Sequence, residues 1–144
     1  MAVHSLQVFP ARLRIARTTA GLKQETIAAA IGVNPSLLCA LEKGRRWMTN
    51  EELVPRLVQA LNSRPNEAEA LRQAAMHDKA IHTLQRLGFP LELLVLVSQT
   101  LRLTEVLSPA EIEHLTGYMG KLRSNKTSLA PMLAPDPAAG EHAM

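Results

Sequence analysis

The chain has 144 residues, of which 47% are hydrophobic and 20% are charged, enough apolar material for one folded domain and a small appendage. Alanine and leucine together supply 43 residues, whereas valine and isoleucine supply 13 and aromatic residues four. Because good helix formers outnumber strand formers, the composition predicts an all-α protein and argues against a sandwich, a barrel or a doubly wound sheet.

Composition also narrows the function. The single cysteine, Cys39, excludes an internal disulfide and a cysteine-rich zinc site. His77 and His82 are five residues apart, which does not suit a shared metal-binding face of a helix, so they and the distant His114 are predicted to be surface residues. The sequence shows no carboxylate pair, Ser/His/Asp arrangement or phosphate-binding loop. We therefore expect no enzyme, no cofactor and no metal.

Neither a membrane span nor a secretory signal is expected. The apolar stretch at residues 93–97 is bounded by Glu92 and Ser98, and it is much shorter than the roughly 18 residues that a span requires. Residues 1–14 have neither a leading basic cluster nor a long apolar segment. Together with the single cysteine, these features favour a cytoplasmic protein.

The net charge of +3 is unevenly distributed. Residues 1–48 hold seven basic and two acidic side chains, a net charge of +5, whereas residues 49–144 carry a net charge of −2. All the excess positive charge therefore lies in the first third of the chain. This asymmetry suggests that the first third binds a polyanion such as nucleic acid.

Two short helices are predicted first, over residues 10–20 and 23–31. Gly21 ends the first, and Gly32 ends the second in a left-handed conformation. The residues expected to face inward are Leu13, Ile15 and Ala16 in the first helix and Ile27, Ala28 and Ile31 in the second.

A third helix is predicted over about residues 35–43, after a tight turn at residues 32–34. Asn34 is a good N-cap, and Pro35 suits the first helical position, where its missing N–H has no cost. Leu38 and Leu41 are expected to face inward, and Gly44 to end the helix.

The next helices carry competing start signals. Thr49 and Glu52 match a capping box, but Pro55 follows closely, and we favour a fourth helix that begins at Pro55. Asn66 is expected to cap a fifth helix, which ends at residues 88–90.

Residues 91–107 are apolar nearly all round, so we expect a helix that is covered on several sides. Ser108, Pro109 and Glu111 combine an N-cap, a helix-start proline and a capping-box glutamate. The helix that follows carries a narrow apolar seam, which could pack within the monomer or against a second copy. The seam consists of Ile112, Leu115, Met119 and Leu122. Residues 125–144 are rich in Ser, Ala and Pro and are expected to be disordered.

One stretch, residues 21–46, carries a functional motif. Its elements are Gly21-Leu22, Gln24-Glu25, Ala28, Ile31-Gly32-Val33 and Glu42-Lys43-Gly44. In this register they resemble the helix-turn-helix of the phage-repressor and Cro-like regulators, also called the XRE family. The resemblance covers residues 12–61 and implies a five-helix DNA-binding domain, here followed by C-terminal helices and a disordered tail.

The resemblance also implies roles for individual residues. Gln24 corresponds to a phosphate-binding glutamine with Lys23 beside it, and Arg17 to a residue that pairs with Glu42 and touches a phosphate. The N-terminal turn of the third helix, from Asn34, would point its N–H groups toward DNA. Backbone contacts are implied for Lys43, Arg45 and Arg46, and base-reading positions for Pro35, Ser36 and Ala40, with Leu37 and Cys39 flanking them.

The reading positions depart from the family pattern. Many members have Gln, Asn or Arg there, whereas this chain has Pro35, Ser36 and Ala40. Specificity would then rest on Ser36, on apolar contacts of Leu37 or Ala40 with thymine methyl groups and on DNA shape, or selectivity would be modest. Lys23 also replaces the usual Ser or Thr cap.

Two functional hypotheses follow. The first is a transcriptional regulator, most simply a repressor, that binds a double-stranded DNA operator as a homodimer: residues 1–65 bind DNA, residues 66–124 pair the subunits and residues 125–144 form the tail. The second is a protein-interaction module, such as an antitoxin or a regulator's partner, with weak or no specific DNA binding.

Overall fold

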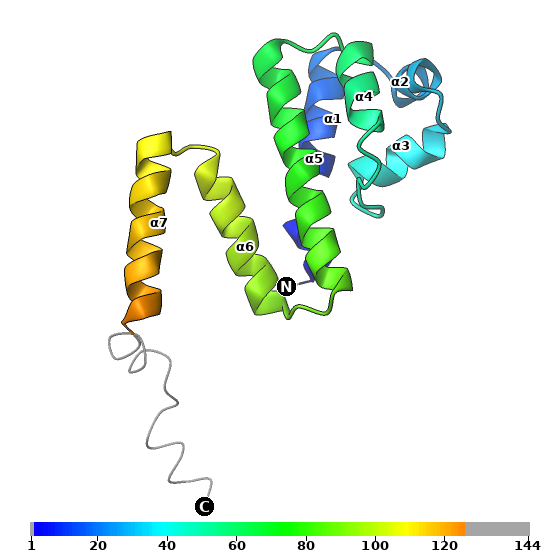
Figure 1. The fold of residues 1–144 in the computed structure, drawn as a ribbon. Coiled ribbons are helices and arrows are strands. Elements are labelled where there is room, and N and C mark those ends of the chain that lie inside the picture. Colours follow the sequence, from blue (N-terminus) through cyan, green and yellow to red (C-terminus); the bar gives the residue numbers. More distant parts are fainter. Residues whose placement is uncertain (1, 126–144) are drawn as a thin grey trace, which may run out of the picture. The chain divides into compact units, whose positions relative to one another are not determined.

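The computed structural model describes residues 2–125, and all regular structure in that range is helical (Figure 1). The predicted all-α class is therefore confirmed. The chain divides into two compact units, with the boundary between Arg102 and Leu103. The elements in chain order are the 3-10 helix η1 (Val3–Leu6) and the α-helices α1 (Phe9–Thr19), α2 (Gln24–Ile31), α3 (Pro35–Glu42), α4 (Leu53–Ala60), α5 (Pro65–Arg86), α6 (Leu91–Thr104) and α7 (Pro109–Ser124).

Helices α1 to α5 enclose the main core of the first unit. Helix α1 packs against both α3 and α5, and α2 packs against both α3 and α4. The largest fully buried side chains of this core are Phe9, Leu13, Ile27, Leu38, Leu57 and Leu71. Since α5 contributes Leu71 and the neighbouring alanines to the same core, the compact unit is longer than the predicted DNA-binding segment of residues 1–65.

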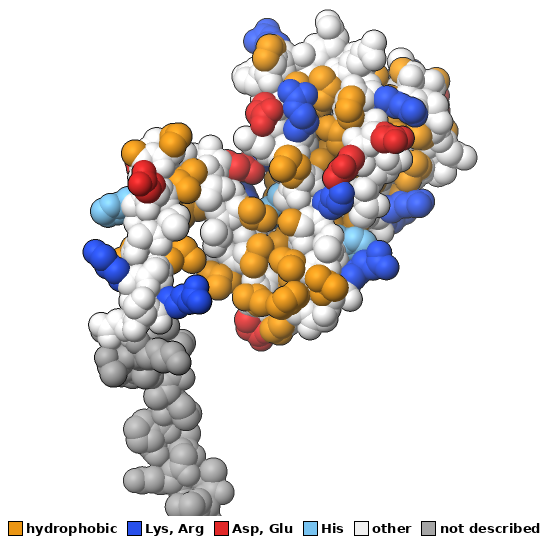
Figure 2. All heavy atoms as spheres, viewed as in Figure 1, with side chains coloured by type: hydrophobic (Ala, Val, Ile, Leu, Met, Phe, Trp, Pro, Cys, Tyr) orange, Lys and Arg blue, Asp and Glu red, His pale blue; other side chains and the backbone are white. Residues whose placement is uncertain are grey.

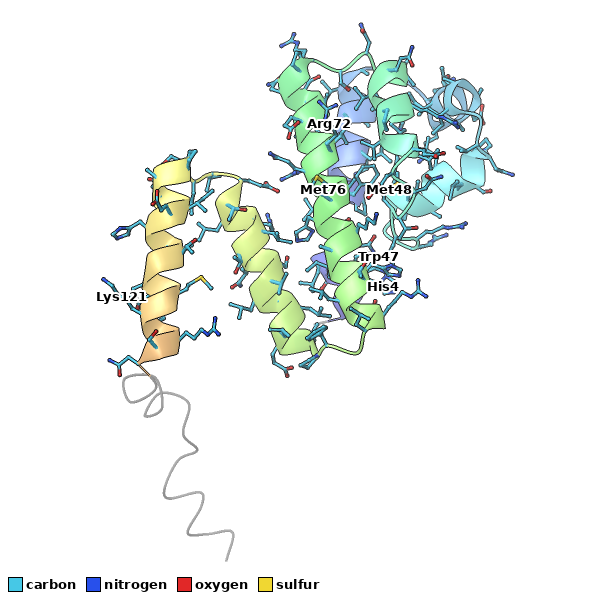
Figure 3. All side chains as sticks on the ribbon, in the orientation of Figure 1. His4, Trp47, Met48, Arg72, Met76 and Lys121 are labelled. Atoms are coloured by element: carbon cyan, nitrogen blue, oxygen red, sulfur yellow. The ribbon has the colours of Figure 1, made fainter. Side chains whose placement is uncertain are left out.

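A second cluster joins η1, α5 and α6. Its buried residues are Leu6, Ile81 and Leu94, and Trp47 packs against them. The Trp47 ring lies near two histidine rings. Its centroid is 5.7 Å from that of His4 (Figure 3) and 5.2 Å from that of His82. Trp47 thus packs against the first unit, as a large aromatic side chain should.

The turn between α2 and α3 has the predicted geometry. Gly32 adopts φ +74°, and the amide of Val33 donates to the carbonyl of Ala28 at 3.0 Å, which closes α2 in a left-handed cap. Asn34 caps α3 by accepting a hydrogen bond from the amide of Ser36 at 3.0 Å. The predicted Gly32 stop and Asn34 cap are both confirmed.

Three predictions for α1, α4 and α5 are wrong. Ile15 is 61% exposed, because it lies two residues, about 200° around α1, from the buried Leu13. Helix α4 begins at Leu53 rather than Pro55, which occupies its first turn, where the N–H lacks an acceptor in any case. Helix α5 is preceded by Arg64, whose amide donates to Glu67 Oε2 at 3.1 Å, so Asn66 lies inside the helix and does not cap it.

The expectation that residues 91–107 are covered on several sides is also wrong. Within α6 the buried residues are Leu94 and Ser98, whereas Leu96 and Leu103 are exposed. Helix α6 is therefore attached to the first unit along a single narrow stripe, although its composition is apolar nearly all round.

The second unit carries α7, whose predicted start is confirmed. Ser108 Oγ accepts from the amide of Glu111 at 3.2 Å, and Glu111 Oε2 accepts from the amide of Ser108 at 2.7 Å. No residue of α7 is buried, and Met119 of the predicted seam is 53% exposed. Apart from Asn125, the predicted tail at residues 125–144 lies outside the described residues.

Candidate nucleic-acid interface

Helix α3 is held rigidly and presents its N-terminal end to solvent. Leu38 and Leu41 anchor it in the main core. Of the predicted base-reading residues, Pro35 and Ser36 are exposed, whereas Ala40 is half-buried. The flanking residues Leu37 and Cys39 are half-buried as well, and Leu37 packs against the main core. The freely accessible part of the reading face is therefore the first turn of α3.

That first turn contains a polar contact that the sequence analysis missed. Asn34 Oδ1 accepts from Ser36 Oγ at 2.8 Å as well as from the Ser36 amide. The hydroxyl proton of Ser36 is therefore used within the cap, and the hydroxyl oxygen of this exposed residue remains available as an acceptor. The amide Nδ2 of Asn34 has no hydrogen-bond partner in the described part of the chain, so Asn34 is the side-chain donor of this turn. In the sequence, the Asn34-Pro35-Ser36 run at the start of α3 is the pattern that indicates this side-chain contact.

A buried carboxylate clamps the first three helices together. Glu42, only 4% exposed, forms an ion pair with Arg17 Nε, and its Oε2 accepts from Arg17 Nη2 at 3.1 Å. Gln24 Nε2 donates to the same Oε2 at 2.6 Å, and Arg17 Nη1 donates to the carbonyl of Leu22 at 2.9 Å. Arg17 belongs to α1, Gln24 to α2 and Glu42 to α3. The hydrogen bond to Glu42 raises the pKa of Arg17, so this guanidinium stays charged.

This clamp limits what Arg17 and Gln24 have left for a phosphate. Three of the five N–H groups of Arg17 and one N–H of Gln24 are already used inside the domain. Both residues therefore serve first to position α2 and α3, and two N–H groups of Arg17 and one of Gln24 remain for a phosphate. The pairing of Arg17 with Glu42, which the family resemblance implied, is present in the structure.

Cationic side chains flank α2 and α3. The exposed ones among the predicted contacts are Lys23, Lys43, Arg45 and Arg46, and none of these four forms an ion pair with another described residue. Gly44, at φ +70°, turns the chain between them, and its carbonyl accepts from Gln7 Nε2 at 2.8 Å. The loop that carries the two arginines is thus tied to the N-terminal segment.

A buried polar cluster corrects the prediction for His77, which is not a surface residue. His77 Nδ1 lies 2.8 Å from Asp78 Oδ1, and His77 Nε2 lies 2.8 Å from Ser98 Oγ of α6. The Asp78 carboxylate also accepts from the amides of Val8 and Phe9 at 2.9 and 3.0 Å. Asp78 therefore caps the N-terminus of α1 from a helix that lies 70 residues away in sequence.

In space, His77 lies between Ser98 and Asp78, as the histidine of a nucleophilic triad lies between its serine and its aspartate. This arrangement was not found from the sequence. All three side chains are buried, so a substrate has no access to the serine hydroxyl. The carboxylate, moreover, holds the first turn of α1. The cluster is therefore a structural connection between α1, α5 and α6.

Two further properties concern residues 2–125. No group of three or more His, Cys, Asp or Glu side chains in that range could hold a metal ion. None of the helices there is both long and apolar enough to cross a membrane.

Comparison with known proteins bears on α1 to α5. Residues 9–71 match the family model of a helix-turn-helix domain, a family associated with XRE-like regulators. No curated protein and no solved structure matches the chain. The matched segment begins with α1 and reaches into α5, so it contains α2, α3, the clamp at Glu42 and the flanking cationic side chains, but not the cluster of His77, Asp78 and Ser98. Residues 9–71 of this chain are thus similar to a helix-turn-helix domain of a family associated with XRE-like regulators.

Proposed function

We propose that the protein is a transcriptional regulator, a repressor in the simplest case, which binds an operator in double-stranded DNA as a homodimer. Helix α3 enters the major groove, with the first turn from Asn34 facing the base edges. The observation that carries this proposal is the rigid, exposed first turn of α3, flanked by cationic side chains that have no ion-pair partner among the described residues.

Phosphate contacts supply most of the affinity. Lys23 at the start of α2 and Lys43, Arg45 and Arg46 after α3 lie on both sides of the reading turn, where each can displace a counterion from the DNA backbone. Helix α2 has no side-chain cap, so its first N–H groups are also available to a phosphate.

Base contacts are few. The reading turn offers the Asn34 amide as a donor and the Ser36 hydroxyl oxygen as an acceptor, with Pro35 and the accessible part of Ala40 for apolar contact with thymine methyl groups. Specificity therefore rests largely on DNA shape and on the spacing of two half-sites, and discrimination between single bases is modest.

The test is the salt dependence of duplex binding. The double variant Arg45→Ala, Arg46→Ala should bind all duplex sequences more weakly, and the slope of log affinity against log salt should fall by about 1.8, because two phosphate contacts are lost. The matched control is Arg56→Ala, Arg86→Ala, which removes two exposed arginines from α4 and α5 and should leave the slope unchanged. An equal fall of the salt-dependence slope in both double variants would refute this placement of the interface.

Homodimerisation is supported by α7. Its apolar seam is spaced 3, 4 and 3 residues apart. Among the described residues 2–125, Met119 of the seam is exposed, and Ile112, Leu115 and Leu122 are half-buried rather than buried. A two-fold operator requires two copies of α3 about 34 Å apart, which a single chain cannot supply.

One observation favours the second candidate, a protein-interaction module. Pro35 and the exposed leucines of α6 are apolar, and a partner protein could cover them. This candidate predicts that the full chain binds no duplex even at low salt, where the regulator would bind most tightly.

A further inference from the structure

A pocket of about 310 Å³ opens between α4, α5 and the loop that precedes α4. Its apolar lining consists of Met48, Val54, Pro55, Ala75 and Met76. Figure 3 labels Met76 on α5 and Met48 close to it, and Figure 2 shows hydrophobic side chains on this face with charged ones around them. The volume is at the lower end of the range for small-molecule sites, and the lining is predominantly apolar, as in such sites.

The pocket results from one stripe of α5. Arg72, Ala75, Met76 and Lys79 follow the spacing i, i+3, i+4 and i+7, so all four face the same way, toward α4. The short side chain of Ala75 leaves room for the pocket. Met76 lines the pocket beside it, and the Met76 residue is 71% exposed. An exposed, unbranched thioether can adapt to the shape of a ligand.

The charged groups of the pocket differ at its two ends. Lys79 is paired with Glu51, which neutralises one end. Arg72 lies two turns away along α5, about 10 Å. It contacts Glu69 through Nε at 3.3 Å, in a half-exposed pair that is weak by nature. Neither terminal nitrogen of Arg72 has a hydrogen-bond partner among the described residues. The edge of the guanidinium that can donate two parallel hydrogen bonds to a carboxylate is therefore free.

We propose that this pocket is a binding site for an amphipathic organic anion, an aliphatic carboxylate. The alkyl chain lies along Met48, Val54 and Met76, and the carboxylate accepts hydrogen bonds from the terminal nitrogens of Arg72. The apolar lining and the available cation at its edge together indicate this class of ligand. A neutral alkyl chain would form no hydrogen bond with Arg72, and the charge of Arg72 would repel an alkylammonium ion.

The probes are unbranched alkyl carboxylates of four to ten carbons, titrated into the full chain without DNA. Binding is measured by calorimetry and by the fluorescence of Trp47, the single tryptophan, which directly precedes Met48 in the chain. Affinity should rise about fourfold per added methylene until the pocket is full. At equal chain length, the alcohol and the amine should bind more weakly than the carboxylate.

Two variants test the assigned contacts. Arg72→Gln should weaken octanoate binding about two- to fivefold and leave octanol binding unchanged, whereas the control Arg56→Gln, outside the pocket lining, should change neither. Met76→Asp should abolish octanoate binding, because it places a carboxylate on the wall of the pocket. Since Met76 is exposed, circular dichroism should show an intact fold, as for the control Gln85→Asp on the same helix.

Three results would overturn the proposal: affinity that does not depend on chain length, an alkylamine that binds as tightly as the carboxylate, or undiminished octanoate binding by Met76→Asp. Absence of binding by every carboxylate at 10 mM, on the order of the weakest useful affinity, would overturn it as well. Because DNA is absent from these titrations, none of these results bears on the proposed regulator function.

Discussion

Glu42 shows how a single buried charge shapes the helix-turn-helix domain. Its carboxylate is held by Arg17 from α1 and by Gln24 from α2, so three helices depend on one side chain. A buried ion pair stabilises a fold weakly compared with apolar residues of the same volume, but removal of one partner leaves an uncompensated charge. The clamp therefore sets the relative positions of α1, α2 and α3 more than it adds net stability.

Removal of one partner should cost more than removal of both. Arg17→Met should lower the free energy of unfolding by about 3 kcal/mol, because it leaves the Glu42 carboxylate buried without its partner. The double variant Arg17→Met, Glu42→Met should be less destabilised than Arg17→Met alone. Urea denaturation measures both, with the exposed Arg14→Met as a control that should stay within about 0.5 kcal/mol of the unmodified chain. A double variant at least as unstable as the single one would contradict this account.

Asn34 combines a cap with a potential DNA contact, and two substitutions separate these roles. Asn34→Ala should lower the unfolding free energy by about 1 kcal/mol, because it removes the oxygen that accepts from the Ser36 amide. Asn34→Asp keeps that oxygen, so its stability should be near normal, but duplex binding should weaken because the Nδ2 donor is replaced by a negative oxygen. Asn66→Ala is the matched control for stability, since Asn66 does not cap α5. Equal losses of stability for Asn34→Ala and Asn66→Ala would disprove the capping role.

At the scale of helices, three local signals were confirmed, each of them contained within a few residues. The left-handed Gly32, the Asn34-Pro35 start of α3 and the Ser108 capping box of α7 are all of this kind. The start of α4 was missed because Leu53 and Val54 are buried in the main core, and their burial extends the helix ahead of Pro55. Packing therefore outweighed the proline signal there.

Helix α6 should open before the rest of the first unit. Two of its 14 residues are fully buried, Leu94 and Ser98, and Ser98 is hydrogen-bonded to His77. Its other contacts with the second cluster come from the half-buried Leu91, Val95 and Val97, so few fully buried contacts oppose its release. Native-state hydrogen exchange should give the amides of α6 a smaller opening free energy than those of α1 to α5.

Ser98→Ala should reduce that opening free energy by a further 1–3 kcal/mol or so, because His77 Nε2 then loses its buried partner. Thr100→Ala, which removes a hydroxyl bonded to a carbonyl within α6 itself, is the control and should have a smaller effect. If α6 exchanges only together with α1 to α5 in the unmodified chain, α6 is an integral part of the domain.

At the scale of the whole molecule, the seam of α7 is proposed to pair two subunits, and it combines the exposed Met119 with the half-buried Ile112, Leu115 and Leu122. The double variant Leu115→Glu, Met119→Glu should be monomeric by light scattering and should bind duplex DNA more weakly, because two apolar contacts of the proposed dimer become charged. The control His114→Glu, Gly117→Glu adds the same two side chains off the seam, where a side chain at Gly117 meets no neighbour within 4 Å. A seam variant that stays dimeric would exclude α7 as the dimer contact.

Composition and short-range patterns were sufficient for the helical class, the α2 to α3 turn and the helix-turn-helix assignment, because each depends on residues within a turn or two of one another. The contact between Asp78 and α1 spans 69 residues, the clamp between Arg17 and Glu42 spans 25, and the contact between His77 and Ser98 spans 21. Hydrophobic periodicity within a short stretch of sequence carries no information about such distant pairs. The burial of His77, the exposure of α6 and the pocket beside Met76 are therefore settled by how the helices pack, since packing determines which side chains lose their water.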